Sequence, residues 1–243
     1  MPRKKNNLKT QALNEVAYQK IKELIVTLKL SPKAQIDEEW VADTFSIGRT
    51  PIREALFRLN AEHLVELVRG RGFFVKDINL KDVGSLFETL LILERSAVAL
   101  AARRGKQDQL TELQKTNSDL DQAWGKKDFL QVTFLNSQFH RIVYEATDNS
   151  FLIAYLNNIQ NQTQRLAFLC FSKEQPSYDI QTHAERAVKD HELLIEQFRS
   201  GNAIKAVEII SEHVKLFQRR VVHFMLPTLE LVDSVPPVQA ATI

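Results

Sequence analysis

The chain has 243 residues, enough for two domains of ordinary size, and its composition of 44% hydrophobic and 26% charged residues is that of a soluble globular protein. Only seven glycines and seven prolines are present, which disfavours a turn-rich all-β fold and favours long helices. Its one cysteine, Cys170, excludes a disulfide framework and a cysteine zinc site.

No apolar segment approaches the length of a membrane span, and the basic start MPRKKNNLKTQ lacks the apolar core of a signal peptide. We therefore expect a cytoplasmic protein with no membrane partner. The charge is uneven, because residues 1–76 contain 14 Lys and Arg against 9 Asp and Glu, whereas the rest contains 18 against 21. A basic head on an acidic body favours an anionic partner for the head, although an imbalance of this size also arises by chance.

Residues 1–10 are predicted to form a disordered basic arm, and residues 11–76 a folded domain. Apolar spacing over residues 12–30 predicts a helix that ends at Ser31-Pro32. Asp37 is a suitable N-cap for a second helix over residues 38–44. After a turn at residues 46–48, Thr50 is expected to cap a third helix that has Pro51 at its first position.

Two short β-type runs, residues 64–68 and 73–75, flank Arg69-Gly70-Arg71-Gly72, which is typical of a hairpin tip. The order helix, helix, turn, helix, two-stranded wing predicts a winged helix-turn-helix that binds double-stranded DNA. A helix N-terminus presents free N–H groups to phosphate, and its first side chains reach base edges in the major groove. The predicted DNA-contacting residues are Arg49, Thr50, Pro51, Arg53, Arg69, Arg71 and Gly72.

Residues 77–81 are expected to form a linker to a second domain over residues 82–225. Periodicity there predicts about six helices, over residues 81–104, 107–124, 128–147, 150–171, 179–199 and 202–224. Gly105, Gly125 and Gly201 lie where C-caps are expected. The predicted fold is therefore mainly α, with an N-terminal winged helix-turn-helix and a C-terminal all-α bundle. Residues 226–243 contain three prolines and little periodicity, which is typical of a flexible tail.

The stretch IDEEWVADTFSIGRTPIREALFRLNAEHLVELVRGRGFFV resembles the DNA-binding domain of the GntR family of bacterial transcription regulators, most closely in RTPIREAL and RGRGFFV. The second part resembles the FCD-type effector domain of the FadR-like subfamily in LFETLLILE, AARR, NSQFHRIVYEATDN and DHELLIEQFRSGNAIKAVEIISEH. The resemblance implies a dimeric repressor or activator that binds operator DNA. It also implies a helical domain that binds a small metabolite, often a carboxylate, and commonly a divalent metal.

The chain departs from the family pattern at several positions. Glu39 stands where members often carry a DNA-contacting arginine, so an unusual operator preference is expected. Leu90 replaces an arginine that is often found in the first helix of the effector domain. Asn136 replaces the usual aspartate ligand of the metal, and its amide oxygen is a neutral, weaker ligand.

Three of the six histidines, His140, His191 and His213, are candidates for one metal site. Asn136 and His140 are four residues apart and share a helix face. His191 and His213 lie at similar distances from the turn at Gly201, so two antiparallel helices place them at one level. Spacing alone leaves open whether these are ordinary helix histidines. The resemblance, which matches each position, implies a zinc, nickel or manganese ion held by Asn136, His140, His191 and His213.

Arg165 lies in the middle of a predicted helix beside apolar residues and is a candidate anchor for an acidic effector, with an internal salt bridge as the alternative. The leading hypothesis for the whole chain is a metabolite-responsive regulator that is not an enzyme. One alternative is a helical metal-dependent hydrolase with an accessory nucleic-acid-binding head, for which Glu192 is the available general base. Against it, the chain has no H-E-x-x-H, nucleophile elbow or phosphate-cradling glycine loop. Another alternative, a constitutive architectural DNA-binding protein, does not need the large second domain.

Overall fold

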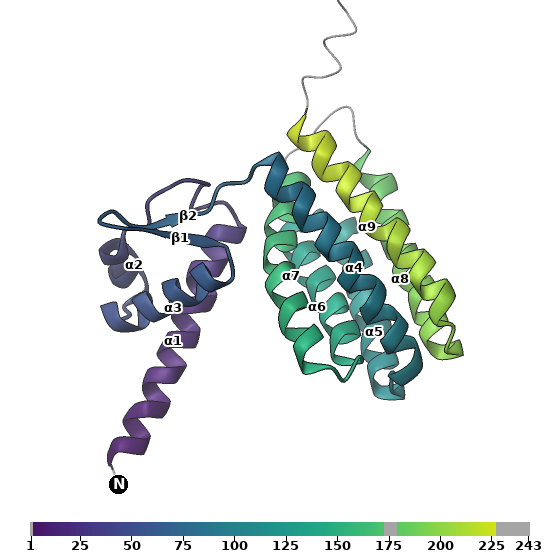
Figure 1. The fold of residues 1–243 in the computed structure, drawn as a ribbon, viewed down its shortest axis with the longest axis horizontal. Helices are drawn as coiled ribbons and strands as arrows, with labels where there is room; N and C mark the ends of the chain where they lie inside the picture. The colour runs from purple at the N-terminus through teal and green to yellow at the C-terminus, as the bar shows by residue number, and fades with distance from the viewer. Residues whose placement is uncertain (1, 173–178, 227–243) are drawn as a thin grey trace, which may run out of the picture.

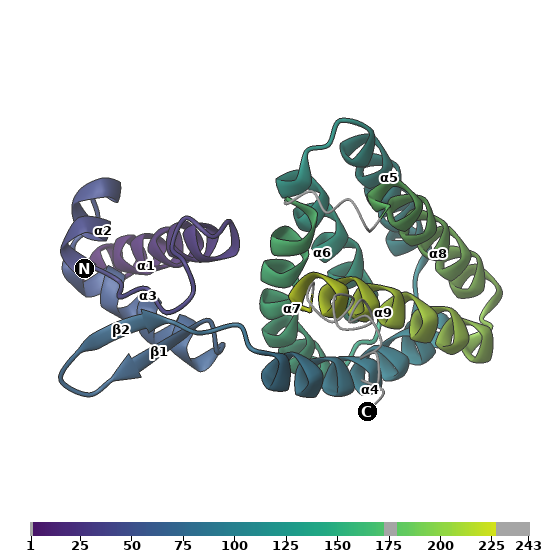
Figure 2. The same cartoon turned by 90° about the horizontal axis from the view of Figure 1, so that it is seen from above.

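The computed structural model describes residues 2–172 and 179–226, with side chains placed from residue 12 onward. A small head is joined by an extended segment to a larger helical body (Figures 1 and 2). The predicted flexible tail lies, from residue 227 on, outside the described residues. Among the described residues, no helix is both long and apolar enough to cross a membrane.

The head is a winged helix-turn-helix, as predicted. It consists of α1 (Pro2–Val26), α2 (Glu38–Phe45), α3 (Arg49–Ala61), β1 (Val65–Val68) and β2 (Gly72–Val75). Asp37 caps α2 through hydrogen bonds from two backbone N–H groups, as expected from the sequence. A separate hydrophobic core holds these elements together and includes Ile21, Ile25, Ile52, Leu56, Leu59 and Phe73.

Two local predictions for the head differ from the structure. Residues 2–10, predicted to be a disordered arm, continue α1, since no helix-breaking residue follows Pro2 and proline suits the first turn of a helix. The third helix begins at Arg49, with Gly48 as its N-cap and no capping side chain, so Thr50 is not the cap. Pro51 therefore lies one turn into the helix, where its missing N–H still leaves no intrahelical bond unmade.

The wing is a two-stranded antiparallel hairpin in which Val68 is paired with Gly72 and Val65 with Val75. Arg71 N–H closes the tip by donating to the Val68 carbonyl at 3.0 Å. Gly70 and Gly72 adopt φ angles of 75° and 90°, a left-handed region that other residues rarely enter. The glycines of the predicted tip are thus required by its backbone geometry.

The body is a bundle of α4 (Leu80–Arg104), α5 (Gln107–Gly125), α6 (Phe129–Glu145), α7 (Ser150–Phe171), α8 (Ile180–Ser200) and α9 (Ala203–Met225). These helices match the six predicted from periodicity. Only one of the three expected glycine caps has left-handed geometry: Gly201 has φ of 70°, whereas Gly105 has φ of −57°. After α5 the left-handed residue is Lys127, because Gly125 is still helical.

The head contacts the body through α7, and Glu62 at the end of α3 is the centre of this contact. Its carboxylate accepts hydrogen bonds from the Tyr18 hydroxyl of α1 at 2.7 Å and from the Asn161 amide of α7 at 2.8 Å. The Gln162 side chain of α7 donates to the Glu62 carbonyl at 3.1 Å. Lys22 of α1 donates to Asn161, and burial lowers the pKa of this lysine to about 8. The head is therefore fixed to one helix of the body by specific polar bonds.

Because head and body have separate cores, we expect Leu56→Ala to destabilise the head by about 2–5 kcal/mol while the bundle keeps its stability. Leu56 is completely buried, whereas the control Leu67→Ala changes a side chain that is 48% exposed. Hydrogen exchange resolved by segment checks the result. Equal loss of protection in α4 to α9 would contradict two independent cores.

Candidate functional site

The predicted DNA-contacting residues form one surface of the head, except for one. Arg49, Thr50 and Arg53 are exposed at the start of α3, and Arg71 is exposed at the wing tip. Pro51 is buried, so its side chain shapes the start of the helix and does not face solvent. The surface therefore offers the N-terminus of one helix and the tip of a hairpin, the two parts of a winged head that meet a duplex.

Glutamates of α2 neutralise the two arginines of α3. Arg49 pairs with Glu39, and Arg53 lies 3.6 Å from Glu38. These side chains are largely exposed, so water and salt screen the pairs and each is weak. Phosphate or a base edge can therefore replace the glutamates, and Glu39, noted as a departure from the family, acts here as a partner of Arg49.

The wing is supported from both sides. Phe57 of α3 packs edge-on against Phe73 of β2, with ring centroids 5.2 Å apart. The Gln35 amide donates to the Arg71 carbonyl at 2.8 Å, and the Arg71 guanidinium lies over the Phe74 ring. Phe57, which the sequence left as either a base contact or a packing residue, thus packs against the wing while remaining 47% exposed.

The body brings His140 of α6, His191 of α8 and His213 of α9 together. All three are buried, and one nitrogen of each lies within 4.8 Å of the others. His191 stacks on Phe139 with ring centroids 3.8 Å apart and an interplanar angle of 6°, which fixes the plane of its imidazole. The antiparallel pairing of α8 and α9 therefore produces the convergence that the sequence spacing predicted.

An oxygen from another helix position lies beside Nδ1 of each ring. Glu94 Oε1 of α4 is 3.0 Å from His140 Nδ1, and Asn117 Oδ1 of α5 is 3.0 Å from His191 Nδ1. Asp190 Oδ2 lies at the longer distance of 3.6 Å from His213 Nδ1. Such oxygens fix the tautomer and orientation of metal-binding histidines, leaving Nε2 of His140 and His191 for a ligand. His191 Nε2 is buried and has no hydrogen-bond partner among the described residues.

Burial keeps these groups in the protonation states that a metal requires. It lowers the pKa of His191 well below the ordinary value, and it lowers the pKa of His213 although Asp190 opposes the shift. Burial alone would raise the pKa of Glu94, but His140 and then the Tyr144 hydroxyl hold it below its ordinary value. The arrangement at neutral pH is therefore uncharged imidazoles beside an ionised carboxylate.

Behind Glu94, a hydrogen-bonded chain leads to α7. The Tyr144 hydroxyl donates to Glu94 Oε1 at 2.5 Å and lies 3.0 Å from the side-chain amide of Gln160. The hydroxyl has one proton and the carboxylate is the stronger acceptor, so the Gln160 amide serves as donor when its NH₂ is turned inward. Gln160 is adjacent to Asn161, which bonds to Glu62 of the head. The histidine cluster and the head–body contact thus share α7.

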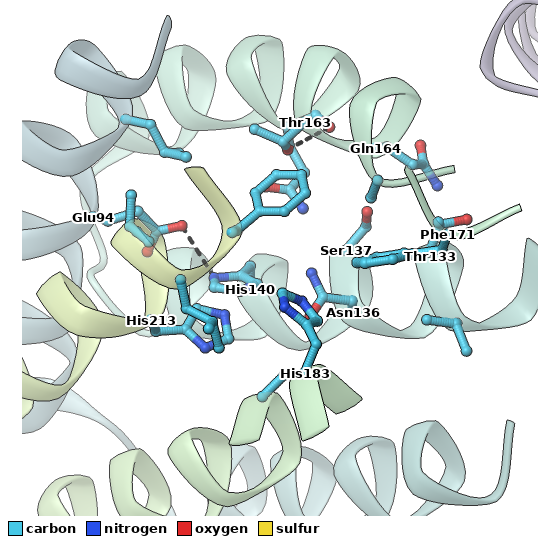
Figure 3. Close-up of a pocket in the computed structure, with 18 of the residues that line it drawn as sticks. Glu94, Thr133, Asn136, Ser137, His140, Thr163, Gln164, Phe171, His183 and His213 are labelled. Atoms are coloured by element: carbon cyan, nitrogen blue, oxygen red, sulfur yellow. Dashed lines mark hydrogen bonds and ion pairs between the residues drawn. The ribbon is translucent and has the colours of Figure 1, made fainter. Parts of the chain in front are cut away.

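The cluster opens into a cavity of about 50 Å³, room for a few water molecules, which Figure 3 shows in close-up. Glu94 points toward His140, with Asn136, His183 and His213 around the same space. Asn136 and Leu90 both line the cavity, so the two departures from the family lie at this site. Glu192 does not line it and instead pairs with Lys189 on the surface, at 2.9 Å.

Arg165 is not part of this cavity. Its side chain is 1% exposed and lies at the junction with the linker, where Nη1 donates to the Lys76 carbonyl at 2.8 Å. The structure therefore does not bring Arg165 to Asn136 and the histidines.

The sequence analysis missed the oxygens that orient the rings. Glu94 carried a signal, because it is a charged residue within the apolar run LLILERSAVAL. Asp190 directly precedes His191, which is a weaker signal. For Asn117 we find none, since its relation to His191 depends on how α5 packs against α8.

Comparison with known proteins supports these two parts. The model of the bacterial regulatory proteins of the gntR family matches residues 13–75, and that of the FCD domain matches residues 85–216. The uncharacterized HTH-type transcriptional regulator YdhC of Bacillus subtilis is 25% identical over 198 residues, covering 81% of this chain and 85% of YdhC. The gluconate operon transcriptional repressor of Bacillus licheniformis is 25% identical over 165 residues, covering 68% of this chain and 67% of its own.

Among solved structures, Escherichia coli McbR/YncC has the same fold, with a TM-score of 0.75 and 20% identity over 88% of this chain and 98% of its own. The two family models together cover the head and most of the body, in the order that the structure shows. The chain therefore belongs to the GntR family of bacterial transcription regulators and consists of a DNA-binding head and an FCD domain.

Proposed function

We propose that this regulator binds its operator as a homodimer of the FadR subfamily and that a small carboxylate, held with a divalent metal ion in the FCD domain, controls this binding. The observation that supports metal control most strongly is the buried convergence of three imidazoles whose ligand atoms lie within 4.8 Å of one another. An isolated buried polar group is costly, and three such rings facing each other are accounted for by a common ligand.

The donor set fits a divalent transition ion. Imidazole nitrogens suit zinc, nickel or manganese, and three nitrogens leave coordination positions open. Asn136 lines the cavity four residues before His140 and is the weak fourth partner. When bound, such an ion supplies the positive charge and the open positions that an effector carboxylate requires. Two relatives are named for the gluconate operon, and gluconate is a carboxylate.

The chain's own residues connect this site to the head. Glu94 holds His140 in one tautomer, and Tyr144 passes its orientation to Gln160 on α7. The neighbouring Asn161 holds Glu62 at the end of the DNA-contacting helix. A shift of α7 when the cavity is filled therefore changes how the head is held, and with it the distance between two heads on an operator.

Dimer formation is supported by large apolar side chains exposed on neighbouring helices of the body. Ile92 of α4 is 65% exposed, and Phe151 and Tyr155 of α7 are 78% and 64% exposed. Burying such side chains against a second copy removes apolar surface from water.

For DNA binding we predict that Arg53→Ala costs about 1–3 kcal/mol on the preferred operator and relaxes specificity at one position of each half-site. Arg71→Ala weakens binding to all sequences and reduces the slope of affinity against salt by about one phosphate contact. Lys126→Ala, which removes the same charge from the exposed surface of the body, is the control. Quantitative footprinting at several salt concentrations makes the measurement, and wild-type behaviour of both arginine variants would show that the reading surface lies elsewhere.

For assembly we expect Tyr155→Lys to shift the protein from dimer to monomer and to reduce operator affinity, because each monomer covers one half-site. Ile204→Lys changes an equally apolar side chain, 78% exposed on α9, and should leave the dimer intact. Sedimentation equilibrium at micromolar concentration decides the matter. A wild-type monomer at that concentration contradicts the proposal.

For the metal we expect His191→Ala to abolish binding of one divalent ion per chain and the rise in melting temperature that the ion produces. Asn136→Asp adds a charged oxygen and should tighten binding, while the exposed-histidine control His63→Ala changes neither property. Because burial holds the pKa values of His191 and His213 low, both rings stay neutral as the pH falls through 6.5. The ion should therefore be retained to a lower pH than exposed histidines would allow, and be lost below that. Elemental analysis and melting curves, with and without chelator, test this; indifference of the metal-loaded wild type to chelator would overturn it.

A further inference from the structure

A second cavity lies where the head, the linker and the body meet. Its volume is about 440 Å³, within the range of small-molecule sites. Its walls come from the end of the head, from the linker at residues 76–79, from the start of α4 and from α7. Figure 1 shows this linker as the extended segment between β2 and α4, beside α7.

The buried guanidinium of Arg165 has one edge that the protein does not use. Nη1 donates to the Lys76 carbonyl, but Nε and Nη2 have no hydrogen-bond partner among the described residues. These two nitrogens form one side of the planar guanidinium, and their parallel N–H bonds match the two oxygens of a carboxylate. A buried group with unmet donors indicates a missing partner.

The charge of Arg165 is also uncompensated by direct contact. Asp77 is near enough to favour the charged form, but its carboxylate pairs with Lys33 at 2.9 Å. Burial lowers the pKa of Arg165 to about 10, which shows how little the surroundings favour its charge. An anion beside the free edge would supply the counter-charge that a buried cation requires.

The remaining walls define the rest of the ligand. Ile78, Val83, Leu86, Ile159 and Leu166 give the cavity an apolar surface. Glu62, Asp77 and Asp82 also line it, and these acidic groups repel a doubly charged phosphate monoester more strongly than a singly charged acid. The site therefore fits one carboxylate attached to an apolar chain or ring.

We propose that this junction cavity binds an apolar monocarboxylate, with its two oxygens on Nε and Nη2 of Arg165. The site is separate from the histidine cavity and does not need a metal. Because its walls belong to the head, the linker and the body, the bound acid fixes the head relative to the bundle. The regulator thus has a second input, at the hinge itself.

The test is calorimetry with hexanoate and benzoate on the chelator-treated full chain, with hexanamide as the uncharged analogue. We expect both acids to bind wild type and His191→Ala equally, and hexanamide to bind neither. Arg165→Met should weaken binding about 10- to 100-fold, the effect of losing hydrogen bonds to a charged group. Its control is Arg104→Met, which removes another guanidinium that donates to a backbone carbonyl.

A second pair of variants keeps the test valid if Arg165→Met folds poorly. Ser85 is exposed on α4 and lines the cavity, so Ser85→Phe should block it without disturbing a core, whereas Ser96→Phe on the same helix lies outside it. Loss of binding in Ser85→Phe alone supports the site. The proposal is overturned if neither acid binds wild type, if Ser85→Phe and Arg165→Met bind like wild type, or if His191→Ala abolishes binding.

Discussion

Three uncharged imidazole rings face one another in the interior of the body, and the surrounding helices are arranged to keep them so. All six helices of the body contribute a polar side chain to this network: Glu94, Asn117, His140 and Tyr144, Gln160, Asp190 and His191, and His213. Buried polar groups are stabilising only when they are partnered. The oxygens at Nδ1 meet that requirement on one side of the rings, and the opposite nitrogens define where a common ligand must sit.

The network matters for DNA binding because it ends on α7, the helix that holds the head. Gln160 faces the interior and Asn161 faces Glu62, so two adjacent residues of α7 belong to the two sites. The unused edge of Arg165 lies on the same helix, one turn further on. Movement of one rigid helix is therefore sufficient to connect ligand binding with the position of the recognition helix, without any change inside the head.

Much of this organisation was predictable from the sequence. The helices of the body follow from strong periodicity and from breaks such as Ser200-Gly201, and the histidine convergence follows from the antiparallel pairing of two such helices. Asn117 and Glu94 were not predicted as ring partners, because contacts between distant helices depend on how whole helices pack. The position of Arg165 was likewise not predictable, since it depends on how the head docks against α7. The start of α3 was misplaced because Gly48, which has no capping side chain, is the N-cap.

The central claim is that the histidine cavity and the DNA-binding surface are energetically coupled, and coupling between two binding sites is reciprocal. The most direct measurement is the affinity of the free protein and of the operator-bound protein for one divalent ion, titrated by calorimetry under identical conditions. The account predicts affinities that differ by about fivefold or more, the range of ordinary allosteric coupling. Equal affinities would show that the head does not sense the cavity, whatever the histidines bind.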